Sequence, residues 1–201
     1  MKLKIVSVGE RVLRTEARPL TGDEIRSAQI CELIEHMRES LRDAPGVGLA
    51  APQIGMPLQL VVIEDKEQYQ AGFSEAELRE RDRKPVPFHV LVNPQLTLLS
   101  PPDASFFEGC LSLPGFTAIV PRAANVRVEA LDHDGAPVHI EATGWYARIL
   151  QHEVDHLRGT LYIDRMRSRS FSSLENYNRH WKTKSHADLV SEFGAYEAPN
   201  S

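Results

Sequence analysis

Two histidines four residues apart, His152 and His156, constrain the fold of this chain more than any other feature of its sequence. Residues at that spacing lie on one face of a helix, so both imidazoles can turn a ring nitrogen toward one point. Glu153 lies about a hundred degrees around the same helix, where a carboxylate can reach a metal-bound water without ligating the ion. The pattern therefore predicts a metal-dependent hydrolase whose helix meets a further ligand from elsewhere in the chain.

The segment around the histidines is typical of a partly buried helix. Thr143 can cap its start and Gly159 can end it. Trp145 and Ile149 fall on the face of the histidines. The adjoining face is apolar, with Leu150, Val154 and Leu157. An exposed polar helix that matches the five-residue pattern by chance would lack this apolar flank, so we expect the histidines to lie beside core residues.

A catalytic metal site of this kind needs a third protein ligand and an open position. The two cysteines of the chain differ in their surroundings. Cys31 lies among apolar residues at helical spacing and is expected to be a small core residue. Cys110 lies between Gly109 and Gly115, where the backbone can approach closely and expose its N–H groups. Cys110 is therefore the candidate third ligand.

Three segments together resemble the peptide deformylases, which remove the formyl group from the starting methionine of new bacterial and organellar proteins. They read GVGLAAPQIG at 46–55, EGCLSLP at 108–114 and QHEVDHL at 151–157. The resemblance implies a divalent ion, ferrous iron in the cell, held by Cys110, His152 and His156. Zinc, nickel or cobalt suits the same donors after purification. It also implies a formyl-methionyl nascent peptide as the substrate.

The resemblance also assigns roles around the ion. Glu153 would take the proton of the attacking metal-bound water and later pass a proton to the departing amine. The donors to the oxyanion would be the backbone N–H of Leu111 and the side-chain amide of Gln53. The loop at Val47 and Gly48 would pair with an extended peptide like an added strand.

Trp145 and Ile149 are candidates to line an apolar pocket for the methionine side chain, although residues at that spacing also suit a plain core. Thr117 stands near the position where many bacterial deformylases carry an arginine that holds the substrate backbone. The sequence therefore leaves this anchor unassigned. This stretch and GWYARI at 144–149 look more like the eukaryotic organellar branch.

The start of the chain has neither the apolar block of a signal peptide nor the composition of a transit peptide, and no run approaches membrane-spanning length. We therefore expect a bacterial, cytoplasmic member of that branch with no membrane association. A net charge of -5 gives no global basic field, so any contact with nucleic acid must be local.

The fold class predicted is α+β, with antiparallel strands packed around a central metal-binding helix and with an N-terminal and a C-terminal helix. A length of 201 residues with 42% hydrophobic content suits one catalytic domain, 1–201. The expected elements are a helix at 23–42, strands at 58–63 and 88–93, and a hairpin at 126–131 and 137–142. Residues 64–87 are expected to form a surface insertion, and 197–201 a frayed tail.

Basic residues gather at 165–184, where one acid, Glu175, stands among Arg165, Arg167, Arg169, Arg179, Lys182 and Lys184. A helix from about Ser172 would pair Glu175 with Arg179 and Lys182, which describes a solvated surface. The functional alternative is that this region docks to ribosomal RNA through phosphate contacts.

Three other functions use the same residues differently. A zinc metalloprotease would keep the His152–His156 helix and take Glu175 as its third ligand. A structural zinc site in a binding protein would need a fourth protein ligand, for which the sequence offers no convincing candidate. A catalytically inactive relative that only occupies the ribosome would not need Gln53, Cys110 and Glu153, all of which are present.

Overall fold

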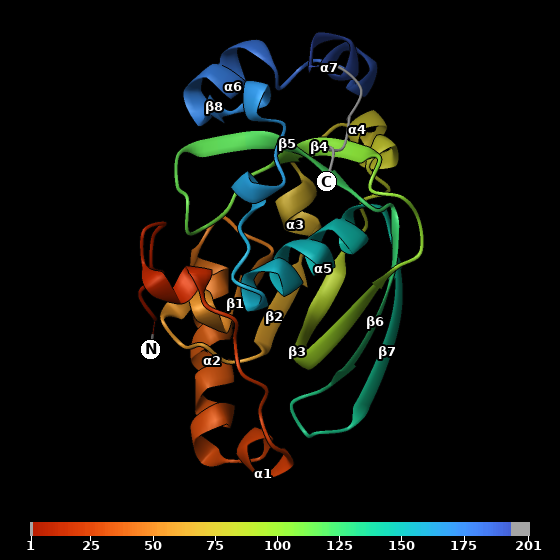
Figure 1. Cartoon of the computed structure of the whole chain (residues 1–201). Coiled ribbons are helices and arrows are strands. Elements are labelled where there is room, and N and C mark those ends of the chain that lie inside the picture. Colours follow the sequence, from red (N-terminus) through yellow and green to blue (C-terminus); the bar gives the residue numbers. More distant parts are fainter. Residues whose placement is uncertain (1, 194–201) are drawn as a thin grey trace.

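A five-stranded antiparallel sheet forms the centre of the computed structural model, which describes residues 2–193. Its strands in spatial order are β1 Gly48–Ala50, β2 Leu60–Asp65, β3 Val86–Leu98, β6 Asn125–Leu131 and β7 Pro137–Thr143 (Figure 1). Strand β6 alternates buried and exposed residues, as a strand with one covered face does, whereas every residue of β2 is buried. The predicted hairpin is confirmed, and β1 stands at an edge of the sheet.

A smaller sheet was not predicted from the sequence. Its strands are β4 Ala104–Glu108, β5 Phe116–Arg122 and the short β8 Ser172–Ser173, with β5 in the middle. Strands β4 and β5 pair up to Glu108 and Ala118, so the loop that carries Cys110 joins two hydrogen-bonded strands at its base. This pairing fixes where the cysteine lies.

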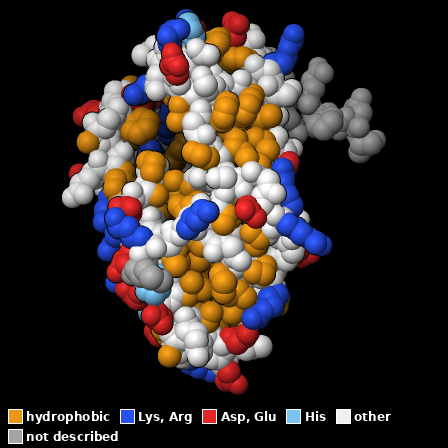
Figure 2. Space-filling view, turned by 90° about the vertical axis from the view of Figure 1, so that its left-hand side faces the viewer, with side chains coloured by type: hydrophobic (Ala, Val, Ile, Leu, Met, Phe, Trp, Pro, Cys, Tyr) orange, Lys and Arg blue, Asp and Glu red, His pale blue; other side chains and the backbone are white. Residues whose placement is uncertain are grey.

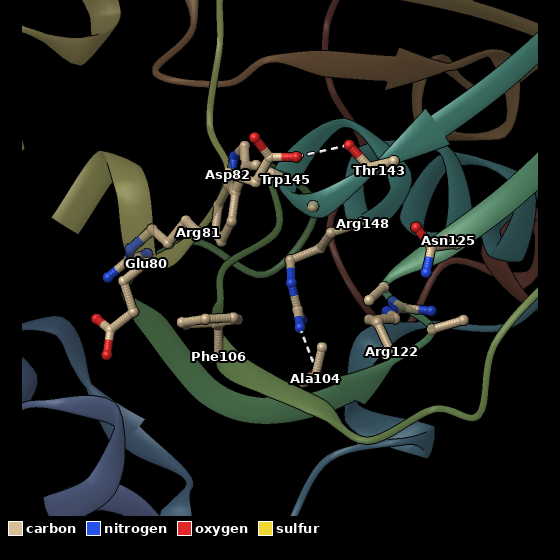
Figure 3. A pocket seen from close by; sticks show the side chains of 13 residues that line it. Glu80, Arg81, Asp82, Ala104, Phe106, Arg122, Asn125, Thr143, Trp145 and Arg148 are labelled. Atoms are coloured by element: carbon tan, nitrogen blue, oxygen red, sulfur yellow. Dashed lines mark hydrogen bonds between the residues drawn. The ribbon is translucent and has the colours of Figure 1, made fainter. Parts of the chain in front are cut away.

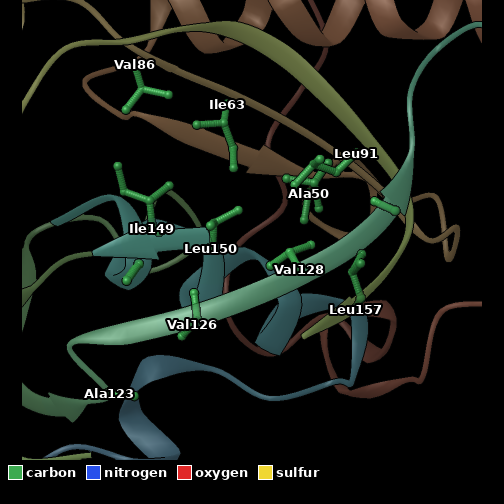
Figure 4. Packing of buried hydrophobic residues seen from close by; sticks show 14 of the residues in the cluster. Ala50, Ile63, Val86, Leu91, Ala123, Val126, Val128, Ile149, Leu150 and Leu157 are labelled. Carbon is green, nitrogen blue, oxygen red and sulfur yellow. The ribbon is translucent and has the colours of Figure 1, made fainter. Parts of the chain in front are cut away.

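Helix α5, Gly144–Leu157, packs on one face of the larger sheet as the sequence predicts. Figure 4 shows Ile149 and Leu150 of this helix facing Ile63 of β2 and Val126 of β6. Thr143 holds the N-cap position, but its hydroxyl donates to Asp82 Oδ2 at 2.6 Å rather than capping the helix. Gly159 follows the C-terminus with φ +66°, in the left-handed region that a helix-ending glycine adopts.

The N-terminal helix predicted at 23–42 is two helices, α1 Gly22–Ile25 and α2 Ala28–Asp43. The continuous helix was wrong because Ser27 is a second N-cap, whose hydroxyl accepts from the backbone N–H of Ile30. Helix α2 covers the opposite face of the sheet from α5 (Figure 1). Cys31 is exposed, so the prediction that it is a core residue was also wrong.

The apolar residues of α2 form one stripe, and Cys31 is next to that stripe instead of on it. The stripe consists of Ile30, Ile34, Met37 and Leu41, which pack against strands β2 and β3. Together α2 and α5 bury both faces of these strands, which explains why β2 has no exposed residue.

The segment predicted as an insertion at 64–87 contains two short helices, α3 Glu67–Gln70 and α4 Glu75–Glu80. Its two ends belong to β2 and β3, and an ion pair between buried Arg83 and buried Asp65, at 2.8 Å, joins them. The tail predicted at 197–201 lies outside the described residues. The single-domain organisation remains a prediction.

The remaining elements are short. They are the 3-10 helices η1 Arg11–Arg14, η2 Ala51–Ile54, η3 Tyr162–Asp164 and η4 Ser168–Ser170, and the helices α6 Leu174–His180 and α7 His186–Phe193. Ser173 caps α6, close to the start predicted at Ser172. Within residues 2–193, no helix combines the length and apolar character needed to cross a membrane.

Candidate metal centre

Helix α5 turns both histidines toward the loop between β4 and β5. The ligand atoms of Cys110, His152 and His156 all lie within 4.8 Å of one another, and the Cys110 Sγ to His156 Nε2 distance is 3.3 Å. Cys110 is distant in sequence from the two histidines of α5, so the β4–β5 pairing and the packing of α5 create the site. A thiolate and two imidazoles are the donors that a catalytic site for a divalent transition ion uses, and the residues therefore fit such an ion.

His152 is oriented by a buried carboxylate. Its Nδ1 lies 2.9 Å from Glu108 Oε2, which leaves Nε2 as the nitrogen available for an ion. Burial alone would lower the pKa of His152. Contacts with Cys110 and Glu108 outweigh burial and raise this pKa well above its usual value. The surroundings thus stabilise positive charge at this point. A divalent cation bound to the same donors would receive the same stabilisation.

Glu108 is itself held by two buried arginines. Arg122 donates to both of its carboxylate oxygens, at 2.9 and 3.0 Å, and Arg148 Nη1 donates at 2.6 Å. Burial alone would raise the pKa of Glu108, but Arg122, His152 and Arg148 hold it well below its usual range. Glu108 is therefore a permanent carboxylate that fixes His152.

Sequence reasoning missed this group of Glu108, Arg122 and Arg148. The available signal was charge in positions expected to be buried: Arg148 lies within the amphipathic α5 segment, and Arg122 follows an apolar run. Arg122 also donates to Asp155, which accepts from Arg165 Nε at 2.7 Å. Arg165, predicted as part of a basic surface, thus contributes to the support of α5.

Glu153 is buried beside the donors with 4% exposure. Its Oε2 has no hydrogen-bond partner among residues 2–193. Burial raises the pKa of Glu153 to about 7, although His152 opposes this shift. A Cβ on Gly48 would lie 2.2 Å from Glu153 Oε1, so only glycine leaves room for the carboxylate against β1.

The loop 46–55 brings Gln53 to the same place. Gln53 is 1% exposed, and its Oε1 accepts from the backbone N–H of Ala50 at 2.9 Å. Its amide nitrogen consequently points to the cysteine loop, 3.6 Å from Cys110 Sγ and 3.3 Å from Ser112 Oγ. The structure brings Gln53 and the candidate ligands together. The side chain of Leu111, the other predicted donor residue, packs so close to Gly46 that a Cβ there would lie 2.9 Å from it.

Val47 immediately precedes β1, and its carbonyl accepts from Glu64 N at 3.0 Å. Ile149 is 4% exposed within the core, and Trp145 lies beside Phe106, with ring centroids 6.3 Å apart. The cavity that Trp145 lines includes none of the three metal donors in its wall (Figure 3). The substrate-binding roles of these residues remain predictions.

Two further positions bear on the alternatives. Thr117 is buried, and its hydroxyl donates to the Glu108 carbonyl at 2.7 Å, so its hydrogen-bond donor is already bonded within the protein. Glu175 lies on α6 and pairs with Arg179 at 3.0 Å. It is in neither of the two groups of convergent donors within residues 2–193. Glu175 therefore cannot serve as the third metal ligand that the metalloprotease alternative requires.

The sequence matches the family model described as polypeptide deformylase over residues 2–172. It is 46% identical over 172 residues to the chloroplastic peptide deformylase 1A of Solanum lycopersicum, covering 86% of this chain and 62% of that protein. Peptide deformylase 3 of Streptomyces avermitilis is 48% identical over 179 residues, covering 89% of this chain and 78% of the relative. This chain thus spans less than two thirds of the tomato protein's length.

A crystal structure of the class I type b peptide deformylase from Acinetobacter baumannii, described as bound to Met-Ala-Ser, superposes with a TM-score of 0.73. The two sequences are 31% identical, and the match covers 83% of this chain and 99% of the other. The predicted α+β fold and the resemblance found in three segments are both confirmed. The chain belongs to the polypeptide deformylase family.

Proposed function

We propose that this protein is a metal-dependent hydrolase that removes the N-terminal formyl group from formyl-methionyl peptides. The observation that carries the proposal is the convergence of Cys110, His152 and His156 beside buried Glu153, in a member of the polypeptide deformylase family. Cys110, His152 and His156 would hold one divalent ion, which when bound activates water and polarises a carbonyl. The donor set accepts several ions. We propose Fe²⁺ in the cell, although intrinsic affinity favours Zn²⁺.

The protein's own groups then have separate tasks. The unpartnered oxygen of Glu153 accepts a proton from the attacking water and returns one to the amine nitrogen as the C–N bond breaks. The amide of Gln53 donates to the charge that develops on the formyl oxygen. The backbone N–H of Leu111 is proposed as the second donor. The Gln53 amide is preorganised because Ala50 fixes its oxygen end.

The peptide is proposed to lie along β1. The outer side of this strand pairs with no other strand of residues 2–193, and Gly48 with the preceding Val47 are the residues proposed to pair with substrate. Trp145 and Ile149 stay as candidates for the methionine pocket. The bacterial relatives support our proposal that the protein works in a bacterial cytoplasm.

Formyl-Met-Ala-Ser and acetyl-Met-Ala-Ser, incubated with anaerobically purified protein, test the proposed function. We expect formate and free Met-Ala-Ser from the first peptide and no release of acetate from the second. Mass spectrometry of the products separates this reaction from proteolysis. Cleavage at an internal peptide bond, with the formyl group retained, would favour a protease and contradict the proposal.

Cys110→Ser should reduce bound metal to below about a tenth of the parent's content and abolish hydrolysis, because a neutral hydroxyl replaces a thiolate ligand. Cys31→Ser is the matched control, since Cys31 is exposed on α2. Its metal content and rate should equal those of the parent. Metal analysis after gel filtration measures the metal content, and formate release measures the rate. If the two serine variants retain equal metal, Cys110 is not a ligand.

Gln53→Ala should lower kcat by about a hundredfold and change KM by less than about threefold, since a donor aimed at an oxyanion acts mainly in the transition state. Gln53→Glu keeps the oxygen that Ala50 contacts but removes the donor, so it should show the same loss. Steady-state kinetics on the formyl peptide measures both constants. A defect confined to KM would make Gln53 a simple binding residue.

We also propose that basic residues of 165–184 contact the ribosome. The structure leaves a smaller set for this role, because Arg165 pairs with Asp155 and Arg167 donates to Ser105. Arg179 is 62% exposed beside Glu175, and Lys182 and Lys184 follow on the same segment. Figure 2 shows that Lys and Arg side chains are interspersed with Asp and Glu on the face in view, so a contact there would be local.

Charge reversal of Arg179, Lys182 and Lys184 to Glu should reduce co-sedimentation with ribosomes by at least about tenfold at low salt, because phosphate contacts dominate such binding. Hydrolysis of a free formyl peptide should stay normal. Reversal of Arg26, Lys84 and Arg127, which are exposed elsewhere, is the control. If both triple variants sediment equally, the region is only a solvated surface.

A further inference from the structure

The N-terminal segment, residues 2–10, precedes η1, belongs to no helix or strand, and contacts two loops of the candidate site (Figure 1). The backbone N–H of Val6 donates to the carbonyl of Gln53 at 2.8 Å. Two residues later, the backbone N–H of Val8 donates to the carbonyl of Ser112, also at 2.8 Å. The segment therefore links the proposed oxyanion donor to the loop that carries Cys110.

The side chain of Gln53 closes a ring with this segment. Its Nε2 lies 3.3 Å from Ser112 Oγ and 3.6 Å from Cys110 Sγ. Within residues 2–193, no other hydrogen bond joins the loop 46–55 directly to the cysteine loop, 109–115. The nitrogens of Val6 and Val8 are separated by two residues of chain, which span at most about 7 Å. The segment thus limits how far the two loops can move apart.

Both ends of the N-terminal segment are fixed to the rest of the protein. The backbone N–H of Leu3 donates to Ser40 Oγ of α2 at 2.8 Å. The side chains of Leu3 and Ile5 pack against the apolar cluster that includes the stripe of α2. On the other side, Leu13 of η1 is fully buried. A segment that is held at both ends resists movement of the loops, which a free chain end would not do.

A turn at the end of the segment allows one of these contacts to be removed with little disturbance. The backbone N–H of Glu10 donates to the carbonyl of Ser7 at 3.2 Å, so Val8 and Gly9 are the central residues of a β-turn. Gly9 has φ +108°, as the third residue of a type II turn requires, and proline is common at the second position of such turns. Val8→Pro therefore suits the backbone and removes only the N–H that Ser112 accepts.

We propose that Val6 and Val8 are positioning residues, whose backbone N–H groups hold the Gln53 amide in place against the cysteine loop. This inference rests on the proposed role of Gln53 in formyl-peptide hydrolysis. Neither valine contacts the substrate in this scheme, and each acts through Gln53. A donor to an oxyanion is effective only when it is aligned before the reaction, and a shift of about 1 Å is enough to slow catalysis strongly.

Val8→Pro should lower kcat for formyl-Met-Ala-Ser by about tenfold, change KM by less than about threefold and leave the metal content unchanged. Val8→Ala keeps the N–H, so this conservative variant should retain kcat within about twofold. Val6→Pro removes the other N–H and should reproduce the loss. In a Gln53→Ala background, Val8→Pro should lower kcat further by less than about twofold, because the residue through which it acts is gone.

Hydrogen exchange of the Gln53 side-chain amide tests the same contact without relying on activity. In the zinc-loaded full chain, which is diamagnetic, NMR should show this amide exchanging at least about tenfold faster in Val8→Pro than in Val8→Ala, because the loops open more readily. Urea titration checks that both variants are folded under the conditions of the measurement.

The outcomes separate this inference from the proposed function. If the parent does not hydrolyse the formyl peptide, the proposed function is contradicted, while the exchange rates still decide whether the segment holds Gln53. Equal exchange rates in Val8→Pro and Val8→Ala would overturn the positioning role. So would an unchanged kcat in Val8→Pro, a defect confined to KM, a loss of metal, or the same loss of kcat with and without Gln53.

Discussion

Glu153→Gln should lower kcat for formyl-peptide hydrolysis by at least about a hundredfold while leaving the metal content of the protein unchanged. The amide keeps the shape of the side chain but cannot accept a proton. Glu153 is 4% exposed, and Gly48 leaves room for its carboxylate, so an isosteric amide fits without moving β1. None of the three candidate ligands is altered, and helix α5 keeps its core contacts.

Steady-state kinetics and metal analysis of the same preparation check this expectation. Glu141→Gln, which removes a carboxylate that is 67% exposed on β7, is the control and should match the parent in both measurements. If the variant binds metal and retains near-normal kcat, Glu153 is not the general base. Loss of metal together with activity would instead make Glu153 part of the site's structure.

The parts of this site that could be predicted are those set by local spacing. His152, Glu153 and His156 share one helix, so their relative placement follows from helical geometry. Cys110 could be assigned from its glycine-flanked loop, and Gln53 because the family resemblance covered its segment. The structure places Cys110 in one group of donors with His152 and His156. It places the amide nitrogen of Gln53 beside Cys110 Sγ.

What could not be predicted depends on contacts between distant segments. Glu108 orients His152, which is 44 residues away, and the link exists only because β4 pairs with β5 beneath α5. Short strands such as β4 carry too few alternating residues to be recognised. The break at Ser27 was missed for a different reason. A single polar residue marks the start of α2, whereas the apolar stripe that predicts a helix runs along the whole of α2.

Glu108→Ala should reduce the free energy of unfolding by about 3–5 kcal/mol, the loss expected when one partner of a buried charge pair is removed. Arg122 and Arg148, each 3% exposed, would keep their charges in the interior without this carboxylate. Urea titration of the metal-free protein measures the loss. The surface variant Glu141→Ala removes one partner of an exposed ion pair and should cost less than about 1 kcal/mol.

A second substitution separates the two tasks of Glu108. In Glu108→Ala/Arg148→Met, one of the uncompensated charges is gone, so part of the lost stability should return. Metal affinity should stay at least about tenfold weaker than in the parent, because His152 Nδ1 still lacks its carboxylate partner. If the double variant recovered metal affinity together with stability, Glu108 would act only by neutralising the arginines. If Glu108→Ala were as stable as the parent, the buried charges would not depend on this carboxylate at all.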